Sequence, residues 1–308
     1  PLRTRFRGLD LREGMLLEGP AGWGEFSPFL EYDAPTSRPW LESALEAAEL
    51  GWPDPVREVV PVNVTVPACA PERAVEIVRA RAGADTVKVK VAEPGQSLAA
   101  DQARLEAVRA ELGAGKIRID VNGAWSLEEA LRAIPILECA AGGLEYVEQP
   151  CASVEDLALL RRRVDVPIAA DESIRRAADP YRVRDLEAAD IAVLKVQPLG
   201  GVRNCLRIAE EIGLPVVVSS AVETSIGIAA GVALAAALPD LPHACGLATM
   251  QLLEGDVTED SLLPVDGAIR VHRPEVSPEL AQRWRHPDPE AWLARLATVR
   301  AIGQDQPL

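Results

Sequence analysis

The sequence is poor in the residues that build histidine-based metal sites, disulfide scaffolds and membrane anchors. Its 3 histidines lie far apart at His243, His272 and His286, so a histidine-bound zinc is not expected. Its 5 cysteines are scattered and form no CxxC pair, which indicates free thiols in a reduced, cytoplasmic protein. No run of about 18 apolar residues occurs, so we expect no membrane span.

Positive charge is also scarce, because 32 Lys and Arg stand against 47 Asp and Glu, a net charge of −15. Such a surface repels phosphate groups, so neither nucleic acid nor an anionic membrane is an expected partner. The sequence opens with Pro1 and shows no basic, apolar leader, so no signal peptide is expected. The 308 residues suffice for one large α/β domain with a smaller attachment.

From about residue 61 the sequence alternates between short β-branched runs and stretches rich in Ala, Leu, Glu and Arg. The predicted strands are 62–66, 86–92, 116–123, 144–150, 167–173, 191–198, 215–220 and 243–250, with a helix in each interval. Strands that alternate with helices form parallel sheets with right-handed crossovers. Eight such strands closed on themselves predict a TIM-type (β/α)7β barrel. An open, doubly wound sheet is the alternative, although the sequence has no GxGxxG turn.

The helix boundaries carry their own signals. Ser126 with Glu129 three residues later is a capping box, and Ser153 with Asp156 is a related pattern. Three glycines stand where helices are expected to end, namely Gly83, Gly113 and Gly213.

The two flanks do not continue the strand–helix period. Residues 1–58 hold two short strand-like pieces and a helix over about 36–51, and residues 251–308 hold a strand near 268–272 and a helix near 289–301. We therefore expect three segments: a barrel over 59–250 and an α+β capping domain built from 1–58 and 251–308. The cap is expected to cover one end of the barrel.

Acidic residues end three consecutive predicted strands. Asp120, Glu148 and Asp171 are about one strand–helix unit apart, with Lys90 on the strand before them and Lys195 on the strand after. In a barrel of this kind the carboxyl ends of the strands form the mouth, where active sites lie. Although a single Asp at a strand end is more often a helix cap, five ionisable residues on five successive strands indicate one shared site.

Three converging carboxylates would repel one another and raise their pKa values unless a cation lies between them. All-oxygen ligands suit a hard divalent ion, so Mg²⁺ is the expected cofactor and Mn²⁺ the substitute. Strand alternation puts Lys88 and Lys90 on one face, and in a closed barrel that face is the interior. Lysines beside a metal ion are driven toward the neutral, basic form.

These elements together resemble the enolase superfamily, and within it the muconate-lactonising-like group. The resemblance covers nearly the whole chain and rests on six segments: Gly22–Pro28, Lys88-Val89-Lys90, Asp120-Val121-Asn122, Glu148-Gln149-Pro150, Asp171-Glu172-Ser173 and Lys195.

The resemblance implies a role for each residue of these motifs. Asp120, Glu148 and Asp171 would bind Mg²⁺, and Lys90 would remove a proton next to the carboxylate of a small-molecule substrate. Lys195 would face Lys90 across that substrate, and Lys88 would lie near its carboxylate and lower the pKa of Lys90. Two further residues, Asn122 and Glu172, would support the ligands and the base.

Within this group, the compact cap, Arg118 and the segment 219–224 resemble those of a hydro-lyase of menaquinone biosynthesis. The implied reaction is the syn-dehydration of 2-succinyl-6-hydroxy-2,4-cyclohexadiene-1-carboxylate to 2-succinylbenzoate through an enediolate. The predicted substrate contacts at the ends of the last two strands are Ser219, Ser220, Gly246 and Leu247, and Arg118 is expected either to contact the substrate or to support a residue that does. For the two serines, helix capping or turn formation is the alternative.

Other functions remain open at this point. An N-acylamino acid racemase, a dipeptide epimerase or a muconate-type cycloisomerase would use the same lysines. From a different class, Lys195 could form a Schiff base as in barrel aldolases, or the barrel could bind a ligand without catalysis.

Overall fold

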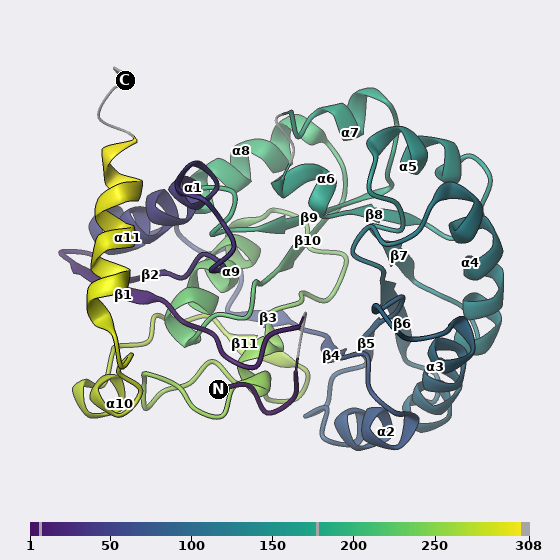
Figure 1. Cartoon of the computed structure of the whole chain (residues 1–308), viewed down its shortest axis with the longest axis horizontal. Coiled ribbons are helices and arrows are strands. Elements are labelled where there is room, and N and C mark those ends of the chain that lie inside the picture. Colours follow the sequence, from purple (N-terminus) through teal and green to yellow (C-terminus); the bar gives the residue numbers. More distant parts are fainter. Residues whose placement is uncertain (6–7, 177–178, 303–308) are drawn as a thin grey trace.

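The computed structural model describes residues 1–5, 8–176 and 179–302. Its centre is a parallel sheet of seven strands in the order β10-β9-β8-β7-β6-β5-β4, which curls as Figure 1 shows. The strands lie side by side in the order in which they occur in the chain. The prediction of consecutive parallel strands from the alternating sequence pattern is therefore confirmed for these seven. The strands are β4 (Val64–Val66), β5 (Thr86–Lys90), β6 (Lys116–Asp120), β7 (Tyr146–Glu148), β8 (Ile168–Ala170), β9 (Ile191–Lys195) and β10 (Val216–Ser219).

The predicted eighth strand, 243–250, is not a strand in the structure. Cys245 pairs with Val62 and Gly246 pairs with Ser219, each through a single bridge. The chain then turns into the 3-10 helix η2 (Ala248–Leu252), which leaves no length for a ladder. These two bridges nevertheless connect the two edges of the curled sheet. The fold is therefore an α/β barrel in which a short irregular segment closes the ring.

A layer of helices covers the outside of the sheet (Figure 1). Val87 and Val89 of β5 are fully buried in the core between sheet and helices, whereas Lys88 and Lys90 face the interior, as alternation predicted. Burying one such apolar side chain stabilises the fold by about 1.5–3 kcal/mol. The helices are α2 (Pro71–Arg79), α3 (Leu98–Leu112), α4 (Leu127–Ala141), α5 (Val154–Arg161), α6 (Glu172–Arg175), α7 (Arg182–Asp185), α8 (Val202–Ile212) and α9 (Ser225–Ala237).

Most predicted helix boundaries are confirmed. Ser126 and Glu129 form a capping box at the start of α4, and Ser153 caps α5 by accepting from the backbone N–H of Asp156. Gly113 and Gly213 terminate α3 and α8. The prediction for Gly83 was wrong, because α2 already ends at Arg79. Gly83 instead has φ +84° and packs so closely on residue 266 that a Cβ would clash.

The two flanks pack on each other, as predicted. The N-terminal flank forms the antiparallel pair β1 (Met15–Gly19) and β2 (Gly22–Phe26), then α1 (Ala34–Leu45) and the π-helical turn η1 (Glu46–Leu50). The C-terminal flank adds α10 (Pro278–Arg283) and α11 (Pro289–Ala301). One buried cluster joins Phe26, Phe29 and Trp40 to Trp292, Leu296 and Val299.

A second link between distant segments is the pairing of β3 (Val59–Pro61) with β11 (Ala268–Arg270). This pairing joins the start of the predicted barrel segment to the predicted C-terminal cap segment. The segment boundaries at residues 58 and 250 stay predictions. Among the described residues, no helix is long and apolar enough to cross a bilayer.

Candidate active site

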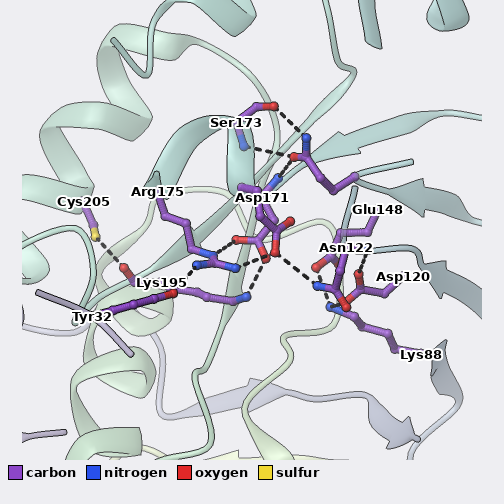
Figure 2. A network of polar contacts seen from close by, with 12 residues as sticks. Tyr32, Lys88, Asp120, Asn122, Glu148, Asp171, Ser173, Arg175, Lys195 and Cys205 are labelled. Carbon is purple, nitrogen blue, oxygen red and sulfur yellow. Dashed lines mark hydrogen bonds and ion pairs between the residues drawn. The ribbon is translucent and has the colours of Figure 1, made fainter. Parts of the chain in front are cut away.

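Neighbouring strands bring the predicted charged residues to one end of the sheet. In the register, Lys90 lies opposite Asp120 and Asp120 lies opposite Glu148. Adjacent strands are about 4.8 Å apart, so these side chains are immediate neighbours. Asp171 directly follows β8, and Lys195 is the last residue of β9. Figure 2 shows Lys88 beside Asp120 and Glu148, and Lys195 beside Asp171.

Each of the three carboxylates is paired with a lysine in this structure. The Lys88 ammonium bridges Asp120 Oδ2 at 2.8 Å and Glu148 Oε1 at 2.5 Å. Lys90 Nζ lies 2.6 Å from Asp120 Oδ2, and Lys195 Nζ lies 2.5 Å from Asp171 Oδ2. All of these side chains are buried. Burying charges this deeply is tolerated only when each has an opposite partner.

The surroundings shift the pKa values of these groups in different directions. Burial lowers the pKa of Lys90 and Lys88 adds to that effect, although Asp120 opposes it. Burial alone would raise the pKa of Asp120, but Lys88 and Lys90 outweigh it and hold that pKa well below its usual value. Burial and the neighbouring Asp120 raise the pKa of Glu148 to about 7. The site therefore makes Lys90 easier to deprotonate than an ordinary lysine and makes Glu148 easier to protonate than an ordinary glutamate.

The donor set fits a hard divalent cation by charge and chemistry. Glu148 Oε2 is buried and has no hydrogen-bond partner, although its sister oxygen accepts from Lys88. Among the described residues, however, no three His, Cys, Asp or Glu side chains converge closely enough to hold a metal ion. In this structure the oxygens of Asp120, Glu148 and Asp171 pair with lysine ammonium groups. A lysine ammonium is thus the cationic partner of each carboxylate. A bound divalent ion would take the place of these ammonium groups at the carboxylate oxygens.

Asn122 and Glu172, predicted as supporting residues, are joined to the same cluster. Asn122 has φ +51°, a left-handed conformation that Asn adopts more readily than most residues. Its Oδ1 accepts from Lys90 Nζ, and its Nδ2 donates to Glu172 Oε1 at 3.1 Å. The local turn after β6 therefore aims one amide at both the lysine and the glutamate.

Two supporting residues went unassigned in the sequence analysis. Gln149 Oε1 accepts from the backbone N–H groups of Asp171 and Ser173, which fixes the turn after β8. Arg175 donates from Nε to Asp171 Oδ1 at 2.8 Å. A signal for each existed in the sequence: Gln149 follows Glu148 directly, and Arg175 lies four residues after Asp171, on the same side of a helical turn.

A small cavity of about 30 Å³ lies among these residues. Glu148 and Asp171 lie behind its wall. From the cap, Leu2, Leu9, Arg12 and Phe29 cover it. The predicted residues that line it are Lys88, Lys90, Asp120, Asn122, Lys195, Ser219, Ser220 and Gly246.

Two of the predicted substrate contacts do not line this cavity. Leu247 is buried against α9, where a Cβ on Gly231 would lie 2.6 Å from its Cδ2. Arg118 sits two residues before Asp120 on the same face, about 7 Å deeper in the barrel. There it pairs with Glu145 at 2.6 Å and donates to Ala244 O at 2.7 Å. The structure thus makes Arg118 a tie across the far end of the barrel.

A larger cavity of about 540 Å³ lies between the cap strands and helices α10 and α11. Met15, Trp284, His286 and Trp292 are among its lining residues. None of the predicted site residues lines it, so size alone does not locate the chemistry of this chain.

Two family models match the chain. The model described as "Enolase C-terminal domain-like" matches residues 71–277, and the one described as "Enolase N-terminal domain-like" matches residues 1–48. The first covers strands β5 to β10 with their strand-end residues, and the second covers most of the N-terminal cap.

Curated relatives match over nearly the full length. An o-succinylbenzoate synthase of Thermobifida fusca is 65% identical over 302 residues, which covers 98% of this chain and 94% of the relative. An o-succinylbenzoate synthase of Mycolicibacterium smegmatis is 53% identical over 304 residues, with the same coverage of both chains.

Solved structures show the same fold at lower identity. Muconate lactonizing enzyme from Pseudomonas fluorescens, complexed with muconolactone, has a TM-score of 0.74 at 23% identity and covers 86% of this chain and 88% of its own. The L-Ala-D/L-Glu epimerase from Bacillus subtilis has a TM-score of 0.70 at 25% identity, covering 83% and 86%.

Proposed function

The chain belongs to the enolase superfamily and, within it, to the o-succinylbenzoate synthases, which are carbon–oxygen lyases; from that premise we propose how it acts. The reaction is the Mg²⁺-dependent syn-dehydration of 2-succinyl-6-hydroxy-2,4-cyclohexadiene-1-carboxylate to 2-succinylbenzoate, a cytoplasmic step of menaquinone biosynthesis. The identity of 65% to a curated synthase supports this choice of substrate.

One observation carries the chemistry. Lys88, Lys90, Asp120 and Lys195 line one buried cavity, and Glu148 and Asp171 pair with two of these lysines from behind its wall. Such a site suits the removal of a weakly acidic proton, because a base and a cluster of cation-binding oxygens lie within reach of one substrate.

Asp120, Glu148 and Asp171 are the residues that would hold Mg²⁺. The bound ion would supply positive charge against the negative charge that develops on the substrate carboxylate. The buried, unpaired Oε2 of Glu148 and its raised pKa support this assignment, since both mark a carboxylate with too little positive charge around it.

Lys90 is the base. In its neutral form Nζ takes the proton from C1 of the substrate, next to the carboxylate, and becomes an ammonium. The same Nζ then donates that proton to the hydroxyl leaving C6 on the same face, so water departs and the ring becomes aromatic. Lys90 returns to its neutral form, which the lowered pKa of this buried lysine supports.

Lys195 acts by its charge from the other side of the cavity. A lysine ammonium over the face of a ring that is becoming aromatic is attracted to its electrons. Asp171 pairs with Lys195 Nζ at 2.5 Å and so holds this side chain in place. Ser219, Ser220 and the backbone at Gly246 line the wall available to the succinyl chain.

The substrate cannot enter the cavity as described, because about 30 Å³ holds roughly one water molecule. Ligand sites commonly measure about 300–1,000 Å³. We therefore propose that the cap residues over the site, Leu9 and Phe29 among them, move when substrate binds.

The test is a direct assay of the full chain with the cyclohexadiene acid and Mg²⁺, followed by the absorbance of the aromatic product. We expect turnover that a chelator abolishes and added Mg²⁺ restores. Absence of dehydration in Mg²⁺-loaded protein would refute the proposal. Turnover that persists in chelator would refute the metal assignment alone.

Racemisation of N-acylamino acids is a second candidate activity. It is favoured by one observation: Lys90 and Lys195 both line the cavity and each pairs with a different carboxylate. Two lysines on opposite sides can remove a proton from one face and return it to the other. N-succinyl amino acids assayed in D₂O would reveal this activity as deuterium incorporation with loss of optical rotation, and unchanged rotation would exclude it.

A further inference from the structure

Arg175 is a buried cation behind the active site that the proposed mechanism does not use. It belongs to α6, the single helical turn that follows Asp171, and its side chain is buried. Its pKa is raised because Asp171 and Glu172 outweigh the effect of burial, so it stays charged. A charged guanidinium at this depth is held by specific partners, and those partners indicate what it does.

The first partner is Asp171, a proposed Mg²⁺ ligand. Arg175 Nε lies 2.8 Å from Oδ1 of that carboxylate, while Lys195 Nζ lies 2.5 Å from Oδ2. The two oxygens therefore have separate partners: Oδ2 pairs with Lys195, which lines the cavity, and Oδ1 is held by Arg175. Since a carboxylate held at one oxygen cannot rotate freely, Arg175 fixes the direction of the other oxygen.

The second partner leads to the proposed base. Arg175 Nη2 donates to Glu172 Oε1, and the same oxygen accepts from Asn122 Nδ2 at 3.1 Å. Asn122 Oδ1 in turn accepts from Lys90 Nζ. Figure 2 shows Arg175, Asp171 and Asn122 within this one network. A single guanidinium thus touches the metal-side carboxylate and, through two side chains, reaches the base.

The third partner belongs to the cap. Arg175 Nη1 lies 3.5 Å from Tyr32 Oη, and the neighbouring Arg176 guanidinium lies 5.9 Å from the centre of the Tyr32 ring. Tyr32 packs edge-on against Phe29, with ring centres 5.5 Å apart. Phe29 lines the cavity that holds Lys90 and Lys195. The cap and the catalytic end of the sheet therefore meet at Arg175.

We propose that Arg175 is a positioning residue that sets Asp171 for Mg²⁺ and, through Glu172 and Asn122, orients Lys90. The proposal rests on the function proposed above. Its physical basis is the planar fork of arginine, which bonds two carboxylates at once and holds them in a fixed relation. Lysine keeps the charge and loses the fork, so charge and geometry can be tested separately.

The experiment compares Arg175→Gln and Arg175→Lys with Arg176→Gln, in the full chain. Arg176 is the matched control, because it is the adjacent arginine and is exposed. Its guanidinium lies over the ring of Tyr32. Mg²⁺ binding is measured by calorimetry on metal-free protein, and kcat and KM are measured with the cyclohexadiene acid. Circular dichroism and thermal melting identify the folded fraction of each variant.

For Arg175→Gln we expect Mg²⁺ affinity and kcat each to fall by roughly 10–100-fold, the usual cost of removing a residue that orients a ligand. KM should change by less than about threefold, because Arg175 does not line the cavity. Arg175→Lys should recover part of the metal affinity and little of kcat. Arg176→Gln should match the parent in both.

Glu172→Gln tests the route to Lys90 even where Arg175→Gln does not fold. Where Arg175→Gln folds, it is also combined with Glu172→Gln in one double variant. If Arg175 acts through Glu172, the fold-loss of kcat in that double variant is smaller than the product of the fold-losses in the two single variants. A double loss equal to that product overturns this half of the proposal. Glu172→Gln with parental kcat overturns it as well.

Other outcomes separate this inference from the proposed function. In one outcome the parent dehydrates the substrate, and Arg175→Gln has the same Mg²⁺ affinity and kcat as Arg176→Gln. That outcome overturns the role of Arg175 and leaves the proposed function standing. A parent that binds Mg²⁺ and does not dehydrate overturns the function, and the affinities still decide the role of Arg175 at Asp171. A parent that does not bind Mg²⁺ overturns both.

Discussion

At the barrel mouth three carboxylates are buried beside lysines, whereas at the junction between the cap and the sheet two carboxylates are buried among hydroxyl and backbone donors. The mouth pairs Asp120, Glu148 and Asp171 with Lys88, Lys90 and Lys195. The junction holds Glu25 of β2 and Glu223 of the segment before α9, both buried.

Hydroxyl and backbone groups donate to the carboxylates at the junction, and the positive charge of Arg12 opposes the rise in their pKa values. Glu25 Oε1 accepts from Ser27 Oγ at 2.6 Å, and its Oε2 accepts from the backbone N–H groups of Thr224 and Gly227 at 3.1 Å. Glu223 Oε2 accepts from the backbone N–H of Ala221 at 2.8 Å. Burial raises the pKa of Glu25, and burial together with Glu25 raises the pKa of Glu223 to about 7.

This difference in partners matches a difference in role: the mouth is the proposed catalytic site, and the junction holds the cap on the sheet. At the mouth, cations keep two carboxylates ionised, so the site can exchange a lysine partner for a metal ion. At the junction, burial raises the pKa of both carboxyls, and Glu25 accepts from N–H groups at the start of α9 that have no partner within the helix. Glu25 thereby attaches the cap to the segment that carries Ser219 and Ser220.

The largest expected effect is on turnover at the mouth. Lys90→Ala should lower kcat by roughly 10²–10⁴-fold, because it removes the group that carries the proton in both directions. Lys116→Ala is the control, since Lys116 is a lysine of the next strand whose side chain is largely exposed and pairs with Glu145. Steady-state assays at saturating Mg²⁺ measure the change, and equal kcat for both variants would remove Lys90 from the mechanism.

Stability is expected to respond next, and again at the mouth. Lys88→Met leaves Asp120 and Glu148 without their bridging cation, so metal-free protein should lose about 3–5 kcal/mol of unfolding free energy. Added Mg²⁺ should restore part of the loss, because the ion neutralises the same oxygens. Urea unfolding with and without Mg²⁺ tests this, and a stable metal-free variant would contradict the role given to Lys88.

At the junction a smaller loss is expected. Glu25→Gln keeps the size of the side chain and replaces one acceptor oxygen by a donor, which then faces backbone N–H groups. The cost should be about 1–3 kcal/mol, typical of buried hydrogen-bonding groups that lose a partner. Urea unfolding measures it, and a loss as large as that of Lys88→Met would erase the contrast between the two regions.

The last prediction is a dependence of stability on pH, which accumulates gradually over the interval between the two pKa values. The pKa of Glu223 is about 7 in the folded chain, above its ordinary value of 4.5, so the folded state binds the proton more tightly. The resulting stability is complete below pH 4.5 and is lost as the pH rises through 7. The free energy of unfolding of the parent, minus that of Glu223→Gln, should therefore fall as the pH rises, by up to about 1.4 kcal/mol per pH unit. A flat difference from pH 5 to 8 would contradict this.

Much of the fold and the mouth was predictable because the signals are local and periodic. The strand–helix alternation predicted the seven parallel strands, and Asp120, Glu148, Lys90 and Lys195 each end a strand in register with its neighbours. The eighth strand was wrong because backbone pairing of residues 243–250 depends on the distant partners Val62 and Ser219.

The sequence by itself determined which residue types stand at the strand ends, since a two-residue alternation and a repeating strand–helix unit operate over short stretches of chain. Only the tertiary structure decided that Lys88 bridges two carboxylates, that Arg118 ties the far end of the barrel, and that Arg175 joins cap and site. Those outcomes depend on which charges meet across the folded interior, where burial compels each charge to find an opposite partner.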